Sequence, residues 1–192
     1  MPDGQVLFDH GVPHDLAMEV IRYARERDLH VQAYRNDQLL IERDRPEAHI
    51  YADHAGMEIH LVPDLGGAMG PTTPKLVIVA QPAMLETILP QVRQIWKGRL
   101  NAATSTPDYL EFTSLDSDKA SAVRFVSDRA GVSREEVAAA GDGRNDVSML
   151  EWVGLGVAVE GSPPEVVAAA HGRTIPRPGH GGIDQLAAML MQ

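Results

Sequence analysis

The sequence has no cysteine, so disulfide bonds and thiolate chemistry contribute nothing to its fold or function. It also has no apolar run of the length that crosses a bilayer. Its first ten residues, MPDGQVLFDH, lack the basic start and the apolar core of a signal peptide. These absences exclude disulfide-stapled and membrane-spanning proteins, and they predict a location in the cytoplasm and no membrane partner.

Basic residues are scarce in this chain. Its 192 residues include 17 Lys and Arg against 27 Asp and Glu, which gives a formal net charge of −10 without any basic run. Such a surface repels the phosphate backbone of nucleic acids, so the sequence predicts no nucleic-acid partner. The eight histidines show no HExxH or comparable spacing, so none of them predicts a zinc site.

What the chain does contain is a strand–loop–helix–strand pattern over residues 137–159. A short apolar run (137–140) leads into the glycine-rich acidic loop GDGRND (141–146), and a short helical pattern and a second apolar run follow. This succession is typical of a parallel α/β sheet, and ligands of such sheets bind beyond the carboxyl ends of the strands. The length of the chain suits one ordinary domain or two small ones.

The acidic loop predicts a magnesium site. Asp142 follows the first strand directly and Asp146 stands where the next helix opens. Carboxylate oxygens suit Mg²⁺, which keeps several waters and binds through few carboxylates together with substrate phosphate. The amino end of a helix also favours an anion nearby. The alternative is that Asn145 and Asp146 only cap this helix, and both roles can hold together.

These residues carry a family resemblance. The run GDGRNDVSML resembles the last conserved motif of the haloacid-dehalogenase-like superfamily, and it is closest to the Cof-type branch of magnesium-dependent phosphatases with a large α/β cap. Residues 118–123 resemble the lysine motif of that family, and residues 179–186 its GHGGI-type segment. The resemblance implies a cap-like domain, an open sheet with helices, over residues 1–113. It implies the C-terminal part of a Rossmann-like parallel-sheet core over residues 114–192.

The resemblance also assigns roles. It makes Lys119 a catalytic residue that contacts the substrate phosphate, and Asn145 a second phosphate-binding residue. It makes Asp142 a direct ligand of Mg²⁺. Asp146 supports this site without contacting the ion, or contacts it through a water molecule. The implied substrates are small phosphorylated metabolites, with sugar phosphates as the first candidate. The sequence departs from the family at Ala120, where glycine is frequent, and at residues 160–162, where Glu-Gly-Ser replaces Gly-Asn-Ala.

The nucleophile motif of the family is not in this sequence. Family members attack phosphorus with the first aspartate of an Asp-x-Asp-Gly-Thr segment. No such segment occurs in the 192 residues. We therefore expect the chain as written to be inactive. Three explanations stay open: a misplaced start or cloned fragment of a normal phosphatase, a truncated non-catalytic binding protein that retains the cap, or a separate chain that supplies the missing part.

The remaining pattern predicts secondary structure and assembly. Residues 118–130 read as a helix whose apolar side is formed by Ala122, Val123, Phe125 and Val126. Pro90 is expected to kink or split a helix over residues 82–97. By the resemblance, the apolar strand over residues 137–140 lacks the central strand with which it would pair, and such an open edge predicts a homodimer. The other predicted strands cover residues 5–9, 30–34, 38–42, 57–62, 75–80, 99–106, 109–112, 155–159 and 173–175.

Overall fold

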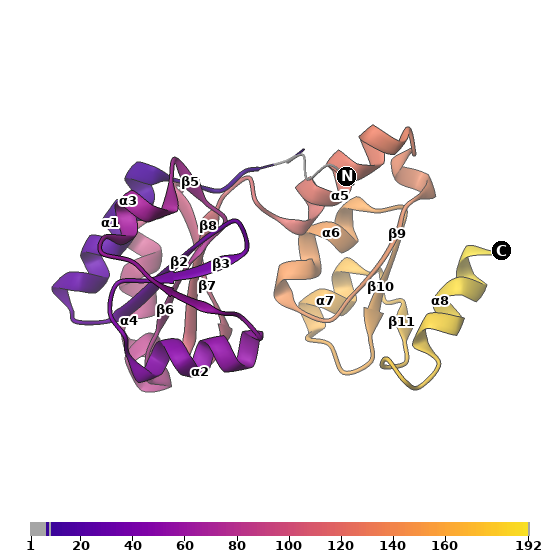
Figure 1. Cartoon of the computed structure of the whole chain (residues 1–192). Coiled ribbons are helices and arrows are strands. Elements are labelled where there is room, and N and C mark those ends of the chain that lie inside the picture. The colour runs from indigo at the N-terminus through magenta and orange to yellow at the C-terminus, as the bar shows by residue number, and fades with distance from the viewer. Residues whose placement is uncertain (1–6, 8, 192) are drawn as a thin grey trace. The chain divides into compact units, whose positions relative to one another are not determined.

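The computed structural model describes Leu7 and residues 9–191, and the chain divides into two compact units, residues 1–116 and 117–192 (Figure 1). The strand expected over residues 5–9 falls mainly outside the described residues. The assignment of the two units as a cap and a partial core stays a prediction. The α/β fold class is confirmed, because both units combine a sheet with helices.

Unit 1 is built on a six-stranded sheet with the order β4-β3-β2-β6-β8-β7. Neighbouring strands run antiparallel except for β3 and β4, which are parallel. Asn36 and Asp37, both with positive φ, form the tight turn between β2 and β3. A separate two-stranded ribbon pairs β1 (Val12–Pro13) with β5 (Thr72–Thr73). The six strands are β2 (His30–Arg35), β3 (Gln38–Ile41), β4 (Ile59–Leu61), β6 (Leu76–Val79), β7 (Leu100–Thr106) and β8 (Tyr109–Ser114).

Helices cover both faces of this sheet. Alternate strand residues, such as Leu76 and Leu110, join the buried cluster formed with α1, α3 and α4. The intervening residues, such as Val77 and Tyr109, pack with α2 on the opposite face. The expectation that Pro90 splits α4 is wrong, since the helix continues through it. The four helices are α1 (His14–Glu26), α2 (Pro46–Ala55), α3 (Leu65–Met69) and α4 (Pro82–Ile95).

Unit 2 contains a three-stranded parallel sheet with the order β11-β10-β9. Leu150, Ala158, Val166 and Ala170 form its small core. Among the described residues β9 pairs with β10 alone, so its other edge is open. The strands are β9 (Ala138–Gly141), β10 (Leu155–Val159) and β11 (Thr174–Ile175). The helices are α5 (Lys119–Ala130), α6 (Val147–Trp152), α7 (Pro164–Ala169) and α8 (Gly182–Leu190), with 3₁₀ turns η1 (Arg134–Glu136) and η2 (Arg144–Asp146).

The burial of α5 differs from the sequence pattern. Ala120 and Ser127 are its buried residues, whereas Ala122 is exposed and 64% of the Val126 surface is accessible. Both had been expected on a buried apolar side. The reason is that nothing in the described part of the chain covers this stripe of the helix. It is left as an exposed apolar surface.

Candidate functional site

The site is built where β9 ends and the chain turns through η2 into α6. Asp146 closes this loop on itself: its Oδ2 accepts the backbone N–H groups of Asp142 and Gly143, each at 2.9 Å. The side chain is almost completely buried, with 4% of its surface exposed. A buried carboxylate that binds two backbone amides fixes the path of the loop. The loop is therefore preorganised before any ligand arrives.

Two glycines make this closure possible. A Cβ atom at position 141 would lie 2.5 Å from Cβ of Asp146, and one at position 143 would lie 2.6 Å from Oδ1 of Asn145. Both distances are too short for real atoms, so Gly141 and Gly143 let the side chains of Asp146 and Asn145 fold back over the loop. The two glycines of the Gly-Asp-Gly run are thus explained by close packing.

Lys119 reaches the loop from α5. It is the first residue of that helix, and its Nζ donates a hydrogen bond to Oδ1 of Asp146, although the two residues are 27 positions apart. A lysine at this position opposes the helix dipole. The helix start is supported by Asp118, whose carboxylate accepts the Ser121 N–H at 2.7 Å in a capping box. The amino group of Lys119 stays accessible, since 49% of its side chain is exposed.

The charge state of Asp146 follows from these contacts. Burial by itself raises the pKa of this carboxyl group, but the hydrogen bonds from Lys119, Gly143 and Asp142 and the lysine charge outweigh it. The pKa of Asp146 therefore lies below its ordinary value of 3.8. At neutral pH the contact with Lys119 is an ion pair.

Asp142 and Asn145 face solvent. Both are exposed, and the carboxylate of Asp142 has no hydrogen-bond partner among the described residues. Arg144, between them, points elsewhere: its Nε donates to Oε1 of Glu165 at 2.5 Å. The structure therefore brings Lys119, Asp142 and Asp146 to one loop and leaves Asp142 as the free carboxylate.

This donor set fits Mg²⁺ in one specific way. Within the part of the chain that the structure describes, no three His, Asp or Glu side chains are grouped so that they could hold a metal ion. Both carboxylate oxygens of Asp146 already accept hydrogen bonds from Lys119 and the loop amides. Asp142 therefore suits direct ligation of the ion, and Asp146 suits a role that holds the loop in place. One available carboxylate matches the preference of Mg²⁺ for water and phosphate oxygens as its other ligands. The assignment of both residues to a metal site stays a prediction.

Sequence reasoning missed the link between Lys119 and Asp146. Nothing local joins two residues that are 27 positions apart, so the sequence gives no direct sign of their contact. The glycines on either side of Asp142 were visible in the sequence. Their packing against Asp146 and Asn145 was not, because it depends on the turn of the loop.

Comparison with known proteins decides the family. Residues 1–183 match the family model described as haloacid dehalogenase-like hydrolase. The chain belongs to this family. Its predicted likeness to Cof-type phosphatases is confirmed. Separately, none of the described helices is long and apolar enough to cross a membrane.

Individual haloacid dehalogenase-like relatives support the assignment. A protein of Haemophilus influenzae with the name 'Putative phosphatase' is 31% identical over 79% of this chain and 53% of its own length. The HMP-PP phosphatase of Serratia proteamaculans is 27% identical over 85% of this chain and 60% of its own length. The crystal structure of TM0651 from Thermotoga maritima superposes with a TM-score of 0.85 at 28% identity, covering 98% of this chain and 71% of that one. This chain spans about half the length of the curated relatives that it matches.

Proposed function

We propose that this chain carries the cap and the C-terminal, cation-binding part of a magnesium-dependent phosphatase for small phosphorylated metabolites. One observation carries the proposal: the buried carboxylate of Asp146 binds both the Lys119 ammonium group and the backbone N–H of the exposed Asp142, at the carboxyl end of a parallel strand. A phosphate needs cationic partners of this kind, and the name of the Serratia relative assigns it such a substrate. Sugar phosphates stay the first candidates, and the cytoplasm, where such metabolites are handled, is the proposed location.

Each side chain has a defined task in this proposal. Bound Mg²⁺ supplies a positive charge that polarises the phosphoryl oxygens. Asp142 holds that ion, while Asp146 fixes the loop and orients Lys119. Lys119 stabilises the negative charge that develops on the phosphoryl group, and the amide of Asn145 donates a hydrogen bond to it. These groups position and stabilise, and they require a separate oxygen nucleophile.

Magnesium binding tests the loop without any turnover. We expect Mg²⁺ to bind the chain weakly and the Asp142→Ala variant to lose the binding heat, because this replacement removes the free carboxylate. Isothermal titration calorimetry measures both proteins. Asp128→Ala, which removes an exposed carboxylate elsewhere in unit 2, is the matched control and should bind as the parent does. Equal heats from the parent and Asp142→Ala would remove Asp142 from the site.

Hydrolysis of p-nitrophenyl phosphate tests the proposed function. The 192-residue polypeptide is expected to show no magnesium-dependent turnover, because attack at phosphorus needs an oxygen nucleophile in line and none of the assigned residues serves as one. A longer polypeptide that supplies an Asp-x-Asp-Gly-Thr segment is expected to be active. Turnover by the short chain that Asp142→Ala abolishes would contradict the first expectation. Inactivity of both would favour a non-catalytic binding protein.

Self-association is the proposed state of this polypeptide. The open edge of β9 and the exposed Val126 give a second copy both unpaired backbone groups and apolar surface. Light scattering should show a dimer, and Ala140→Lys, which adds a charge on the exposed edge strand, should weaken it. A monomer at high concentration would contradict the proposal.

A further inference from the structure

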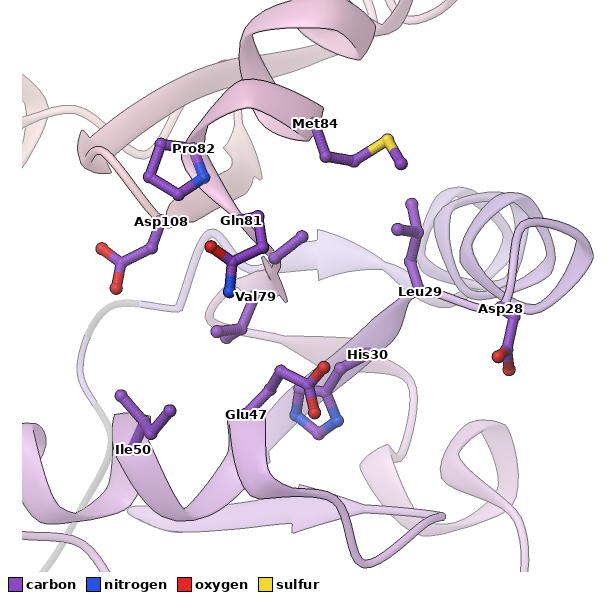
Figure 2. Close-up of a pocket in the computed structure, with 11 residues that line it drawn as sticks. Asp28, Leu29, His30, Glu47, Ile50, Val79, Gln81, Pro82, Met84 and Asp108 are labelled. Atoms are coloured by element: carbon purple, nitrogen blue, oxygen red, sulfur yellow. The ribbon is translucent and has the colours of Figure 1, made fainter.

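A pocket of about 330 Å³ lies in unit 1, at one end of the six-stranded sheet (Figure 2). Its walls come from the start of β2, the end of β6, the first turns of α2 and α4, and the turn between β7 and β8. All of its lining residues belong to unit 1, so the pocket is separate from the acidic loop of unit 2. Its volume suits a small molecule.

His30 is the most deeply buried polar residue of the pocket wall, with 4% of its surface exposed. Its Nε2 lies 3.1 Å from Oε1 of Gln32, whose own Nε2 donates to the Tyr34 hydroxyl at 2.8 Å. Because Gln32 turns a carbonyl oxygen toward the imidazole, Nε2 of His30 is the donating nitrogen. Burial lowers the pKa of His30 and keeps the ring neutral, so Nδ1 carries a lone pair. No described residue donates a hydrogen bond to Nδ1, which makes it an acceptor on the pocket wall.

Two carboxylates share the wall with His30. Glu47, in the first turn of α2, acts electrostatically on the imidazole and has no ion-pair partner among the described residues. Asp108 accepts the Thr106 hydroxyl at 2.8 Å through Oδ1, and its Oδ2 is not engaged by any residue described. The side-chain amide of Gln81 adds a donor and an acceptor, but the charged groups of the pocket without an ion-pair partner among the described residues are both carboxylates. They call for a ligand that donates hydrogen bonds and carries positive charge.

The remaining polar features of the pocket do not favour an anion. The third carboxylate, Asp28, is already neutralised by ion pairs with Arg43 and Arg45. The helices that start at the pocket begin with Pro46 and Pro82, which have no N–H group to offer. The amides of Met84 and Leu85 donate to the carbonyl of Gln81, and that of Ala48 donates to the carbonyl of Arg45. The amides of Glu47 and Ala83 have no acceptor among the described residues, but the carboxylate of Glu47 in the first turn of α2 disfavours an anion there.

Apolar side chains complete the pocket. Ile50 and Met84, which reach it from α2 and α4, are 57% and 47% exposed, although both are large and apolar (Figure 2). Val79 and Pro82 add further apolar surface between them. Surface of this kind is stabilised when an apolar group covers it. A ligand for this pocket therefore carries an apolar body beside its charged donor.

We propose that this pocket binds a small organic ammonium ion, with the cationic group beside His30 and Glu47 and the apolar body against Ile50 and Met84. A bare metal ion does not fit, because within the described part of the chain no three His, Asp or Glu side chains are grouped closely enough to hold one. Nothing in the proposed phosphatase function requires this site, so it is a second binding activity of the chain.

Benzylammonium chloride is a suitable probe, and NMR titration of the full chain through the Met84 methyl and His30 ring resonances is the measurement. We expect saturable shifts at one site. Benzyl alcohol and benzoate, which have the same ring without the positive charge, should bind at least about tenfold more weakly, since a charge-assisted hydrogen bond is lost.

Variants locate the cation. Glu47→Gln should weaken benzylammonium binding by about tenfold, and Asp108→Asn, whose carboxylate points away from His30 and Glu47 in Figure 2, should weaken it less. Glu86→Gln removes an exposed carboxylate of α4 outside the pocket and should leave the binding unchanged. Unsaturable shifts, benzoate bound as tightly as benzylammonium, or equal affinities for all three variants would overturn the proposal. Because the readout is binding in unit 1, failure here leaves the phosphatase proposal untouched, and the reverse also holds.

Discussion

Replacing Asp146 with alanine is expected to lower the free energy of unfolding of unit 2 by about 2–4 kcal/mol, because a buried carboxylate loses charge-assisted hydrogen bonds. The change removes the acceptor of two backbone amides and the partner of Lys119. It also leaves the amides of residues 142 and 143 without their acceptor. Urea unfolding followed through the amide resonances of β10 measures the loss.

Asp142→Ala is the matched control for this experiment. It also removes a carboxylate, four positions from Asp146, but this side chain is exposed and makes no hydrogen bond to the described residues. The free energy of unfolding should therefore change by no more than about 0.5 kcal/mol. The pair therefore separates the two carboxylates, one that holds the loop and one that we propose binds the ion. Equal destabilisation by both replacements would contradict the structural role assigned to Asp146.

The pH dependence of stability follows from the same ion pair. The pKa of Asp146 is lowered in the folded state, so its contribution is complete above the ordinary value of 3.8 and disappears as the pH falls through the lower folded value. Asp146→Asn, which keeps the shape without the charge, should remove this acid-dependent part while Asp142→Asn keeps it.

Replacing Lys119 with alanine is expected to reduce phosphatase turnover by about 10²–10³-fold in the longer polypeptide that supplies the nucleophile segment. Asp146 of the loop positions the ammonium group of Lys119. Loss of this group removes charge stabilisation at the phosphoryl group. The measurement is kcat and KM for p-nitrophenyl phosphate at saturating magnesium. A role in the transition state lowers kcat, whereas a role in ground-state binding raises KM.

Arg129→Ala provides the control for Lys119→Ala. Arg129 is an exposed cation in the last turn of the same helix, so it matches the charge removed but not its position. Its turnover should equal that of the parent. Full activity of Lys119→Ala would remove this residue from the catalytic machinery, and equal losses in both variants would point to a general effect of net charge.

Local patterns were readable from the sequence. The acidic loop of unit 2 was predicted between two strands because apolar runs, glycines and carboxylates follow one another within 23 residues, and this strand–loop–helix order holds in the structure. Asp146 was read as a capping or supporting residue for the same reason. What it binds was not readable, because Lys119 reaches it through the packing of α5 on α6.

Features that depend on tertiary packing escaped the sequence. Residues 64–74 are rich in glycine and proline, a composition typical of loops, yet they contain α3 and β5, which are held by contacts with α1 and β1. Val126 has the helical spacing of a core residue and lies exposed, because a periodic pattern marks an apolar stripe but not what covers it. The pocket beside His30 gave no sign either, since its walls come from four separate segments of the chain.

The position of Lys119 has a consequence for engineering. A cation at the first residue of α5 destabilises the helix by about 0.3–1 kcal/mol through the macrodipole, and an acidic residue there would reverse the sign. This gain is offset, because replacing Lys119 would leave the buried carboxylate of Asp146 without its charged partner. Stability and the proposed activity therefore both favour the lysine, and position 119 is a poor target for raising thermostability.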